Sequence, residues 1–412
     1  MKAGLLLIGL CALTLSVQAV ETLHPPGLLP SKIARALLEQ DPAVAAARAG
    51  LEVALQEARI LDSSPYEWTP RLTGQRRRVD SGLNSNEWNL GVERTIRLPG
   101  KAVADRDLGK ATVEESRARY GEAIYQSARE LMAAWVDWLA AERAMELADI
   151  ARVSVQESLA IVEKRFRAGD ASKLDESIGR AELAEQKRLH SDAKTQAAVA
   201  WSRLTARYPG IPRQITGLPR PLPAGEELNW WRDQILAESA ELKVIQAQMR
   251  KTQSLSERAR ADKLPDPTLG IFTASESGGQ ERISGVTISI PLPGGARRSR
   301  SAKAIAEVEV SRQEVELKRR RLEAEIAAAV AIARGAYESL QYASEGSSIT
   351  QVNAERMQQA YALGEADVQA LLLARRQSNA AANIVLQAQV VALKAYYGLL
   401  IDARLIWELK HE

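Results

Sequence analysis

Cysteine is almost missing from this sequence. The one cysteine, Cys11, lies within an apolar stretch over residues 5–15 that follows a positively charged start and precedes a small-residue site at residues 17–19. This pattern predicts a signal peptide over residues 1–19. The residue before Cys11 is Leu10, where lipoprotein processing needs a small residue, so we expect no lipid anchor. A mature chain without cysteine has no disulfides, thiolate metal sites or cysteine nucleophiles.

Aromatic residues are also scarce. They make up 5% of the 412 residues, and two of them are Phe, whereas a compact globule of this length needs a bulkier core. Chains that are rich in alanine and charge and poor in aromatics favour long helices and coiled coils. The formal net charge of +3 is too small to indicate a nucleic-acid partner. The length allows either two ordinary domains or one duplicated architecture.

Catalytic and metal-binding motifs are missing as well. The three histidines, His24, His190 and His411, have a spacing that fits no metal site. No Gly-rich phosphate loop and no nucleophile motif is present. We interpret the basic run Lys318-Arg-Arg-Arg321 as a solvated helix face rather than a nucleic-acid contact. The sequence therefore predicts no cofactor, no metal and no enzymatic activity.

Proline is unevenly distributed, and its absence marks two long windows. No proline occurs between Pro99 and Pro209 or after Pro293. Because proline inside a helix costs about 3 kcal/mol, these windows are free to form helices of unusual length. The heptad-like spacing from Ile326 to Leu340 indicates a coiled-coil seam. An ordinary amphipathic helix shows a similar period, but globular helices seldom exceed about 25 residues.

Two pairs of matching motifs indicate an internal duplication. Phe166-Arg-Ala-Gly169 matches Tyr361-Ala-Leu-Gly364, and Leu98-Pro-Gly100 matches Leu292-Pro-Gly294 at nearly the same spacing. Glycine is favoured just past a helix C-terminus because it accepts a left-handed conformation. Gly169 and Gly364 are therefore expected to mark the point where each long helix reverses.

The expected organisation has two repeats joined by a Pro-rich linker. Each return helix is about half as long as its rising helix, and a second short helix stacked end to end would supply the missing length of a cylinder wall. The first repeat is 20–210, with a helix near 32–62, a β-hairpin near 68–97, a long helix over 101–168 and a return helix over 170–208. The linker is 211–226. The second repeat is 227–405, with a helix near 227–263, a hairpin near 268–290, a long helix over 296–363 and a return helix over 365–405. A C-terminal tail follows over 406–412.

The predicted strands alternate between apolar and polar residues. Trp88, Leu90 and Val92 share one face, and Asn89 and Glu93 lie on the other. Outer-membrane strands show this pattern, but so does a half-buried sheet in a soluble protein. No later segment has about 18 consecutive apolar residues, so membrane contact would be made by strands. Four strands cannot close, so a membrane location requires several copies to share one barrel in a cyclic homo-oligomer.

The sequence resembles the TolC-like outer-membrane efflux family over nearly the whole mature chain. The resemblance rests on the two helix reversals, the Ala- and Arg-rich helices that follow them, the Leu-Pro-Gly joins and the duplication. The Leu98-Pro-Gly-Lys101 join and the length are most similar to the heavy-metal, CzcC-like branch. The expected fold class is mainly α with a small β part.

The resemblance implies a homotrimer. Its twelve strands would form a barrel among outer-membrane lipids, and its helices a periplasmic tunnel closed at the far tip. A periplasmic adaptor (membrane fusion) protein and an RND-type inner-membrane pump would open the tunnel and supply the energy. The substrates implied are those of efflux, with heavy-metal cations as one class. A channel for type I protein secretion and a non-pore periplasmic coiled-coil protein are the alternatives.

The resemblance also implies a gate at the tip. Family members carry acidic residues just past the helical reversals, and Asp175 matches that place in the first repeat. In the second repeat the matching positions are Ala370 and Leu373, and the nearby acidic residues are Glu365 and Asp367. A ring of carboxylates at a constriction favours cations and resists closure. Asp175, Glu365 and Asp367 are therefore the candidate gate residues, although a solvated helix residue explains Asp175 equally well.

Overall fold

The structure is a computed structural model of the chain, and it describes residues 25–78, 80, 82, 84–214, 217–407 and 409. The signal peptide expected over 1–19 lies outside the described residues. The same order of elements occurs twice, as two helices, a hairpin, a long helix and a return helix, so the duplicated, mainly helical fold is confirmed. The first set is α1 Ser31–Glu39, α2 Pro42–Asp62, β1 Thr69–Arg77, β2 Ser85–Thr95, α3 Pro99–Ala168 and α4 Lys173–Arg207. The second set is α5 Leu228–Glu238, α6 Ala240–Ala261, β3 Thr268–Glu276, β4 Glu281–Ser289, α7 Gly295–Leu363 and α8 Val368–Asp402.

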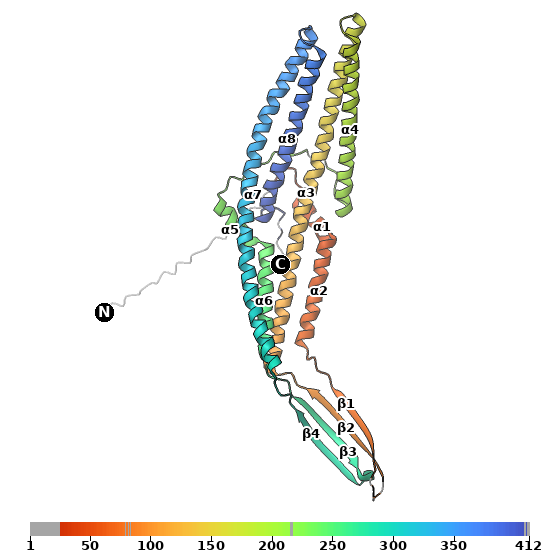
Figure 1. Cartoon of the computed structure of the whole chain (residues 1–412), viewed down its shortest axis with the longest axis vertical. Helices are drawn as coiled ribbons and strands as arrows, with labels where there is room; N and C mark the ends of the chain where they lie inside the picture. Colours follow the sequence, from red (N-terminus) through yellow and green to blue (C-terminus); the bar gives the residue numbers. More distant parts are fainter. Residues whose placement is uncertain are drawn as a thin grey trace, which may run out of the picture.

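The molecule is elongated, with the sheet at one end and two helical tips at the other (Figure 1). The helices α3 and α7 have 70 and 69 residues and run through the whole helical part. Next to the sheet, α2, α3, α6 and α7 lie side by side in that order, and toward the tips the order is α4, α3, α8 and α7. Half-length helices thus share the layer with whole-length ones, as the sequence predicts.

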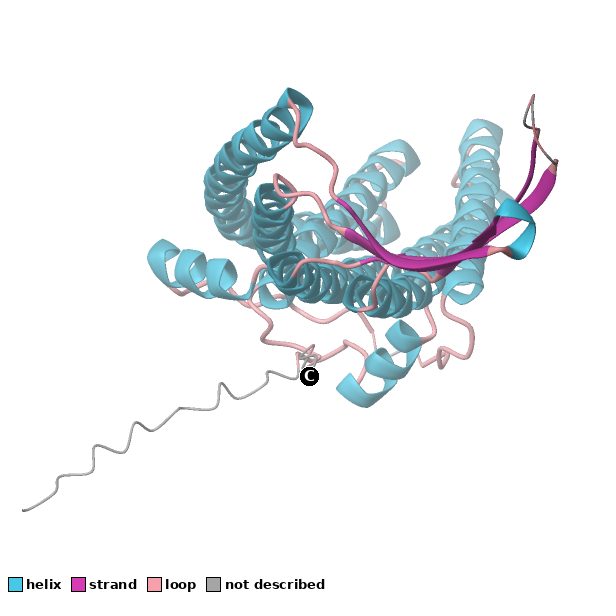
Figure 2. Cartoon of the chain, turned by 90° about the horizontal axis from the view of Figure 1, so that it is seen from below, coloured by secondary structure: helices cyan, strands magenta, loops and turns pink. Residues whose placement is uncertain are grey.

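The layer of helices is curved, and so is the sheet. Seen along the long axis, the helices form an arc that the strands follow (Figure 2). The sheet is antiparallel in the order β1-β2-β3-β4, so the two hairpins pair through β2 and β3. This pairing joins the two repeats into one curved layer at the sheet end.

Two of the predicted helices are each divided in two. The prediction of one helix near 32–62 is wrong because Asp41 and Pro42 start a new helix, in which the Asp41 carboxylate accepts a hydrogen bond from Ala43 N–H at 2.7 Å. The prediction of one helix near 227–263 is wrong because Ser239, with ψ of 114°, leaves the helical region. Its hydroxyl accepts a bond from Leu242 N–H at 3.1 Å. Polar N-caps of this kind start helices.

The main core lies at mid-height, where the half-length helices meet. Trp135 and Trp138 of α3 are buried there, and their ring centroids lie 4.9 Å apart. The indole N–H of Trp407 donates to Leu29 O at 2.8 Å. The expectation of a tail over 406–412 is corrected at its start, because Ile406 and Trp407 are buried in this core. Apolar burial therefore holds the chain here after α8 has ended.

The predicted linker also packs against the body. Ile211 and Ala224 are buried in the main core. The Gln389 side chain of α8 donates to Leu218 O at 3.1 Å and to Pro219 O at 2.7 Å. These contacts satisfy backbone groups that proline-rich backbone cannot pair with itself. The described residues of this segment therefore lie against the core and α8.

Among the described residues, one helix, α8, is long and apolar enough to cross a membrane, judged by length and composition alone. Core helices of soluble proteins pass the same test. The helix packs along α7 and α3, and its residues Leu371, Leu393 and Leu400 are buried. Core packing thus accounts for part of the apolar composition of α8, while Leu373, Ile384 and Val391 are more than half exposed.

Candidate functional site

One face of the sheet is apolar and exposed. The strand register places Leu72 opposite Leu90, Val92 opposite Ile271, and Ile271 opposite Val286, so these side chains share one face. Val286 is 72% exposed and Ile271 61% exposed. We call this surface the apolar sheet face, and its residues are Leu72, Trp88, Leu90, Val92, Leu269, Ile271, Val286 and Ile288. An exposed apolar patch of this extent indicates contact with lipid or with a partner.

The opposite face of the sheet is polar. Arg71 Nη2 lies 2.5 Å from Glu93 Oε1, and Arg77 Nε lies 2.7 Å from Glu87 Oε1. Glu87 also accepts a bond from Gln75 Nε2 at 2.7 Å. We call this surface the polar sheet face. The alternation predicted from Trp88 onwards is present over most of the sheet and is interrupted by Phe272 and Ile283, which lie on this polar face. The pattern matches lipid-facing and lumen-facing sides of membrane strands.

The sheet has two open edges in the part of the chain that the structure describes. The strand order leaves β1 and β4 with a partner on one side only. Backbone groups on an unpaired edge cost several kcal/mol each in hydrocarbon, because no water is present to bind them. A chain with this sheet therefore needs further strands before it can enter a membrane.

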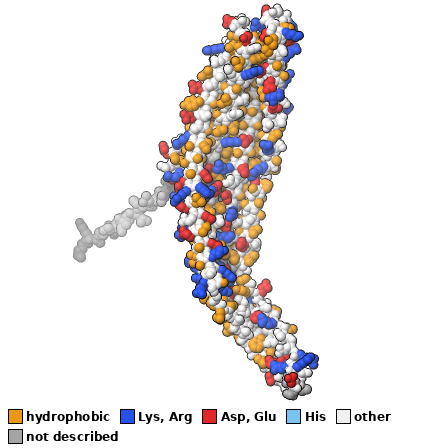
Figure 3. Space-filling model, viewed as in Figure 1, with side chains coloured by type: hydrophobic (Ala, Val, Ile, Leu, Met, Phe, Trp, Pro, Cys, Tyr) orange, Lys and Arg blue, Asp and Glu red, His pale blue; other side chains and the backbone are white. Residues whose placement is uncertain are grey.

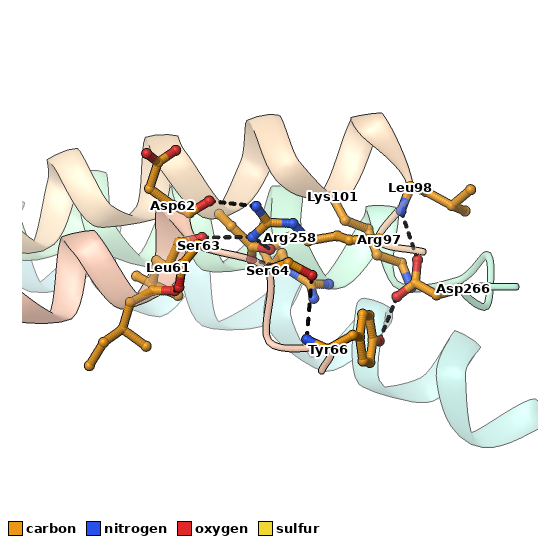
Figure 4. Close-up of polar contacts among 12 residues, drawn as sticks. Leu61, Asp62, Ser63, Ser64, Tyr66, Arg97, Leu98, Lys101, Arg258 and Asp266 are labelled. Carbon is orange, nitrogen blue, oxygen red and sulfur yellow. Dashed lines mark hydrogen bonds and ion pairs between the residues drawn. The ribbon is translucent and has the colours of Figure 1, made fainter. Parts of the chain in front are cut away.

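A buried polar cluster, which we call the joint, connects the sheet to the helices (Figure 4). At its centre Lys101, on the first turn of α3, is 2% exposed. Its Nζ lies 3.1 Å from Asp262 Oδ1 and 2.9 Å from Asp266 Oδ2. Asp266 also accepts bonds from Tyr66 Oη at 2.7 Å and from Leu98 N–H at 3.0 Å. One carboxylate thus links both hairpins to α3.

The charges in the joint are mutually stabilising. Burial on its own would raise the pKa of Asp266, but the Leu98 N–H, the Tyr66 hydroxyl and the Lys101 ammonium together hold it below its usual range. The hydrogen bond to Asp266 raises the pKa of Tyr66. The pKa of Asp262 is lowered in the same way. Burial would raise this pKa, but Arg258 and Lys101 outweigh the effect of burial. The lowered pKa values favour the ionised form of both carboxylates at neutral pH.

An arginine closes the preceding helix in each repeat. Arg97 donates to Leu61 O at 2.7 Å and to Asp62 O at 2.6 Å, at the end of α2. Arg297 donates to Asp262 O at 2.7 Å, just past the end of α6. A cation at a helix C-terminus satisfies free carbonyls and complements the helix dipole. Sequence reasoning missed this device because the partners lie on different elements.

At the far end, each long helix stops at a glycine with positive φ. Gly169 has φ 85° and Gly364 has φ 84°. The next N–H bonds back across the turn in both tips, from Asp170 to Arg165 O at 2.8 Å and from Glu365 to Ala360 O at 2.9 Å. This is the Schellman arrangement, in which a left-handed residue ends a helix. The structure thus places both glycines at the reversals.

Two of the three candidate gate residues are helix caps. The Asp175 carboxylate accepts bonds from Ser172 N–H at 2.9 Å and Ser172 Oγ at 2.8 Å, and Asp175 N–H donates to Ser172 Oγ at 3.1 Å. The Asp367 carboxylate accepts a bond from Ala370 N–H at 2.7 Å. Glu365 is exposed at the second tip. The Ser-x-x-Asp spacing of a capping box is visible in the sequence and could have revealed the role of Asp175.

The two tips are tied together by a contact that sequence reasoning missed. Arg165 Nη1 donates to Tyr361 O at 2.9 Å, and its guanidinium carbon lies 5.0 Å from the centroid of the Tyr361 ring. A small apolar cluster beside it includes Val162, Val368 and Leu371. Cation–π contact and apolar burial together hold α3 against α7 and α8. Among the described residues, no group of three or more His, Cys, Asp or Glu is arranged to hold a metal ion.

The fold and its two ends define a class of protein: a membrane channel subunit with a short strand set and a long helical wall. The family model described as outer membrane efflux protein matches residues 33–207 and 231–399, one match in each repeat. The chain therefore belongs to the outer membrane efflux protein family, a family of channel proteins. Its location is the outer membrane, with the helical part extending into the periplasm.

Solved structures share this fold. The outer-membrane channel OprN matches with a TM-score of 0.73 at 19% identity, covering 92% of this chain and 91% of that chain. The transmembrane channel protein CusC matches with a TM-score of 0.73 at 18% identity, covering 93% and 95%. The outer membrane protein VceC of Vibrio cholerae matches with a TM-score of 0.71 at 15% identity, covering 90% and 95%. Among curated proteins, none matches the chain significantly.

Proposed function

We propose that three copies of this chain form one channel of a tripartite efflux system. Each copy supplies four strands to a shared barrel and its helical wall to a periplasmic tunnel. A periplasmic adaptor and an RND-type inner-membrane pump engage the tips and deliver the substrate. The repeats 20–210 and 227–405, joined by 211–226, are the two structural units of each copy.

The sheet supports this proposal more than any other feature does. It has one apolar exposed face, one face of ion pairs and two open edges. Cyclic association pairs β4 of one copy with β1 of the next and removes every edge. The apolar sheet face then contacts lipid and the polar sheet face lines water. A non-pore coiled-coil protein in the periplasm would not require a sheet with an exposed apolar face and two open edges.

Reconstitution tests the proposal directly. The purified full-length protein should migrate as a heat-sensitive trimer in detergent and should produce uniform conductance steps in planar lipid bilayers. Extraction as a water-soluble monomer, or insertion without conductance, would contradict the proposal. Because the pump supplies the energy, the isolated channel needs no nucleotide for this measurement.

The proposal also includes a substrate class. Among the possible classes, we propose heavy-metal cations. The sequence motif Leu98-Pro-Gly-Lys101 between β2 and α3 supports this assignment. Its Lys101 also lies at the centre of the joint. Co-expression with an RND-type metal pump and its adaptor should raise the tolerated concentration of divalent transition metals in an efflux-deficient host. A rise for organic antibiotics alone would move the substrate class to drugs, and export of a protein would favour type I secretion.

The gate role of Asp175 can be separated from its role as a cap. We expect Asp175→Ala to lower the cation selectivity of the reconstituted channel, because it removes one carboxylate per subunit at the constriction. Ser172→Ala breaks the same capping box at a cost of about 1 kcal/mol and keeps the charge, so its selectivity should match the wild type. Single-channel reversal potentials in a salt gradient measure the difference. If both variants behave alike, the carboxylate acts on the helix and not on the pore.

A further inference from the structure

Four cations gather where the helical part meets the sheet. Arg260 and Lys263 lie at the end of α6, and Arg298 and Arg300 lie at the start of α7. All four are exposed, and we call them the cationic collar. Figure 3 shows Lys and Arg side chains gathered over the sheet-proximal end of the helical part, where α7 begins. The Arg297 bond to Asp262 O, at 2.7 Å, holds these two helix ends together.

The collar has no countercharge of its own within the described residues. The carboxylate of Asp262 in the joint is engaged by other cations, since it lies 3.1 Å from Lys101 Nζ and 3.0 Å from Arg258 Nη1. No ion pair involves any of the four collar side chains in the part of the chain that the structure describes. Several cations further along the helical wall are paired instead: Arg319 and Arg320, for example, each form an ion pair with a glutamate one turn away.

Apolar side chains lie next to the collar on the side of the sheet. Leu292, just before α7, is 93% exposed, Leu264, just after α6, is 65% exposed, and Ile290 is 59% exposed. Along the long axis the order is therefore apolar sheet face, exposed leucines, then unpaired cations. A phospholipid presents the complementary order, with acyl chains beside the strands and an anionic phosphate beside the helices.

We propose that the cationic collar binds the headgroups of anionic phospholipids in the periplasm-facing leaflet of the outer membrane. Exposed Lys and Arg side chains at a membrane surface attract anionic lipids, and several acting together select them over zwitterionic ones. The collar fixes the depth of the sheet in the bilayer and keeps the joint just outside the hydrocarbon. The inference rests on the proposed orientation of the sheet.

Lipid binding to the full-length trimer in neutral detergent tests this inference. Native mass spectrometry and thermal unfolding would be followed during titration with dioleoylphosphatidylglycerol and, separately, dioleoylphosphatidylcholine. We expect wild type to bind phosphatidylglycerol at least tenfold more tightly, with affinity falling as salt rises. The variant with Arg260, Lys263, Arg298 and Arg300 all changed to Gln should lose this preference.

A control variant removes the same number of charges from the helical wall. Its four cations, each paired with a carboxylate three or four residues away, are Arg188, Arg312, Arg319 and Arg320, all changed to Gln. This control should keep the wild-type preference. Equal binding of the two lipids by wild type, or equal loss in both variants, would overturn the inference. Displacement of phosphatidylglycerol by glycerol phosphate at matched concentration would also overturn it, because the site would then recognise free phosphate. Conductance of the collar variant in bilayers shows separately whether the channel itself is intact.

Discussion

Val286→Arg should remove most of the assembled protein from the outer membrane, whereas Thr287→Arg should leave it nearly unchanged. The two positions are neighbours on β4 and point to opposite faces of the sheet. Val286 is 72% exposed on the apolar sheet face, opposite Ile271, and Thr287 lies opposite Gly270 on the polar sheet face. An arginine facing lipid near the bilayer midplane costs about 2–4 kcal/mol, and a trimer would carry three of them.

The measurement is the amount of heat-sensitive trimer in the outer-membrane fraction. Thr287→Arg is a matched control, because it adds the same side chain to the same strand and differs in direction alone. An arginine that points into water at the lumen should alter conductance rather than assembly. If the two variants assembled equally well, or if Thr287→Arg were the one that failed, the assignment of the two sheet faces would be wrong.

Lys101→Met should lower the free energy of unfolding by about 3–5 kcal/mol, the range for breaking a buried ion pair from one side. Methionine is similar in length to lysine, so packing is nearly kept. The loss comes from Asp266, which is 8% exposed and keeps its charge without the ammonium 2.9 Å away. Lys303→Met is the matched control: Lys303 pairs with Glu307 on the surface of α7, and such a pair contributes about 0–1 kcal/mol.

The effect of Lys101→Met should depend on pH. Asp262 and Asp266 have lowered pKa values in the folded protein. Their contribution to stability is therefore present above the unfolded-state pKa of about 4 and is lost as the pH falls through the lower folded values. In Lys101→Met, protonation relieves the unpaired carboxylate of Asp266, so the stability deficit of this variant should shrink as the pH approaches 4. Thermal unfolding of both proteins between pH 7 and pH 3 measures this.

Asp266→Asn combined with Lys101→Met should recover part of the loss, and strict additivity of the two changes would contradict a direct pair.

The helical architecture could be predicted closely because its signals are local. The missing prolines between Pro99 and Pro209 bounded α3, and Gly169 marked its end within the sequence itself. The apolar period does not reveal the breaks at Pro42 and Ser239, because it continues across both positions while a polar cap starts a new helix there. The resemblance indicates Asp175 by its position just past the reversal, whereas its hydrogen bonds to Ser172 depend on the turn that precedes α4.

The duplication can be read from two motifs that recur at nearly the same spacing. The ends of the two long helices and the alternation of the strands can also be read from the sequence, because they depend on residues only a few positions apart. Which charges are paired and which remain free depends on the folded chain. Lys101 meets Asp262 and Asp266 from across the chain, and Arg165 reaches Tyr361 in the other repeat. No local pattern encodes such pairs, since the partners lie far apart in the sequence and meet only in the folded chain. The fold also engages the carboxylates of the joint with Lys101 and Arg258 and leaves the cationic collar exposed.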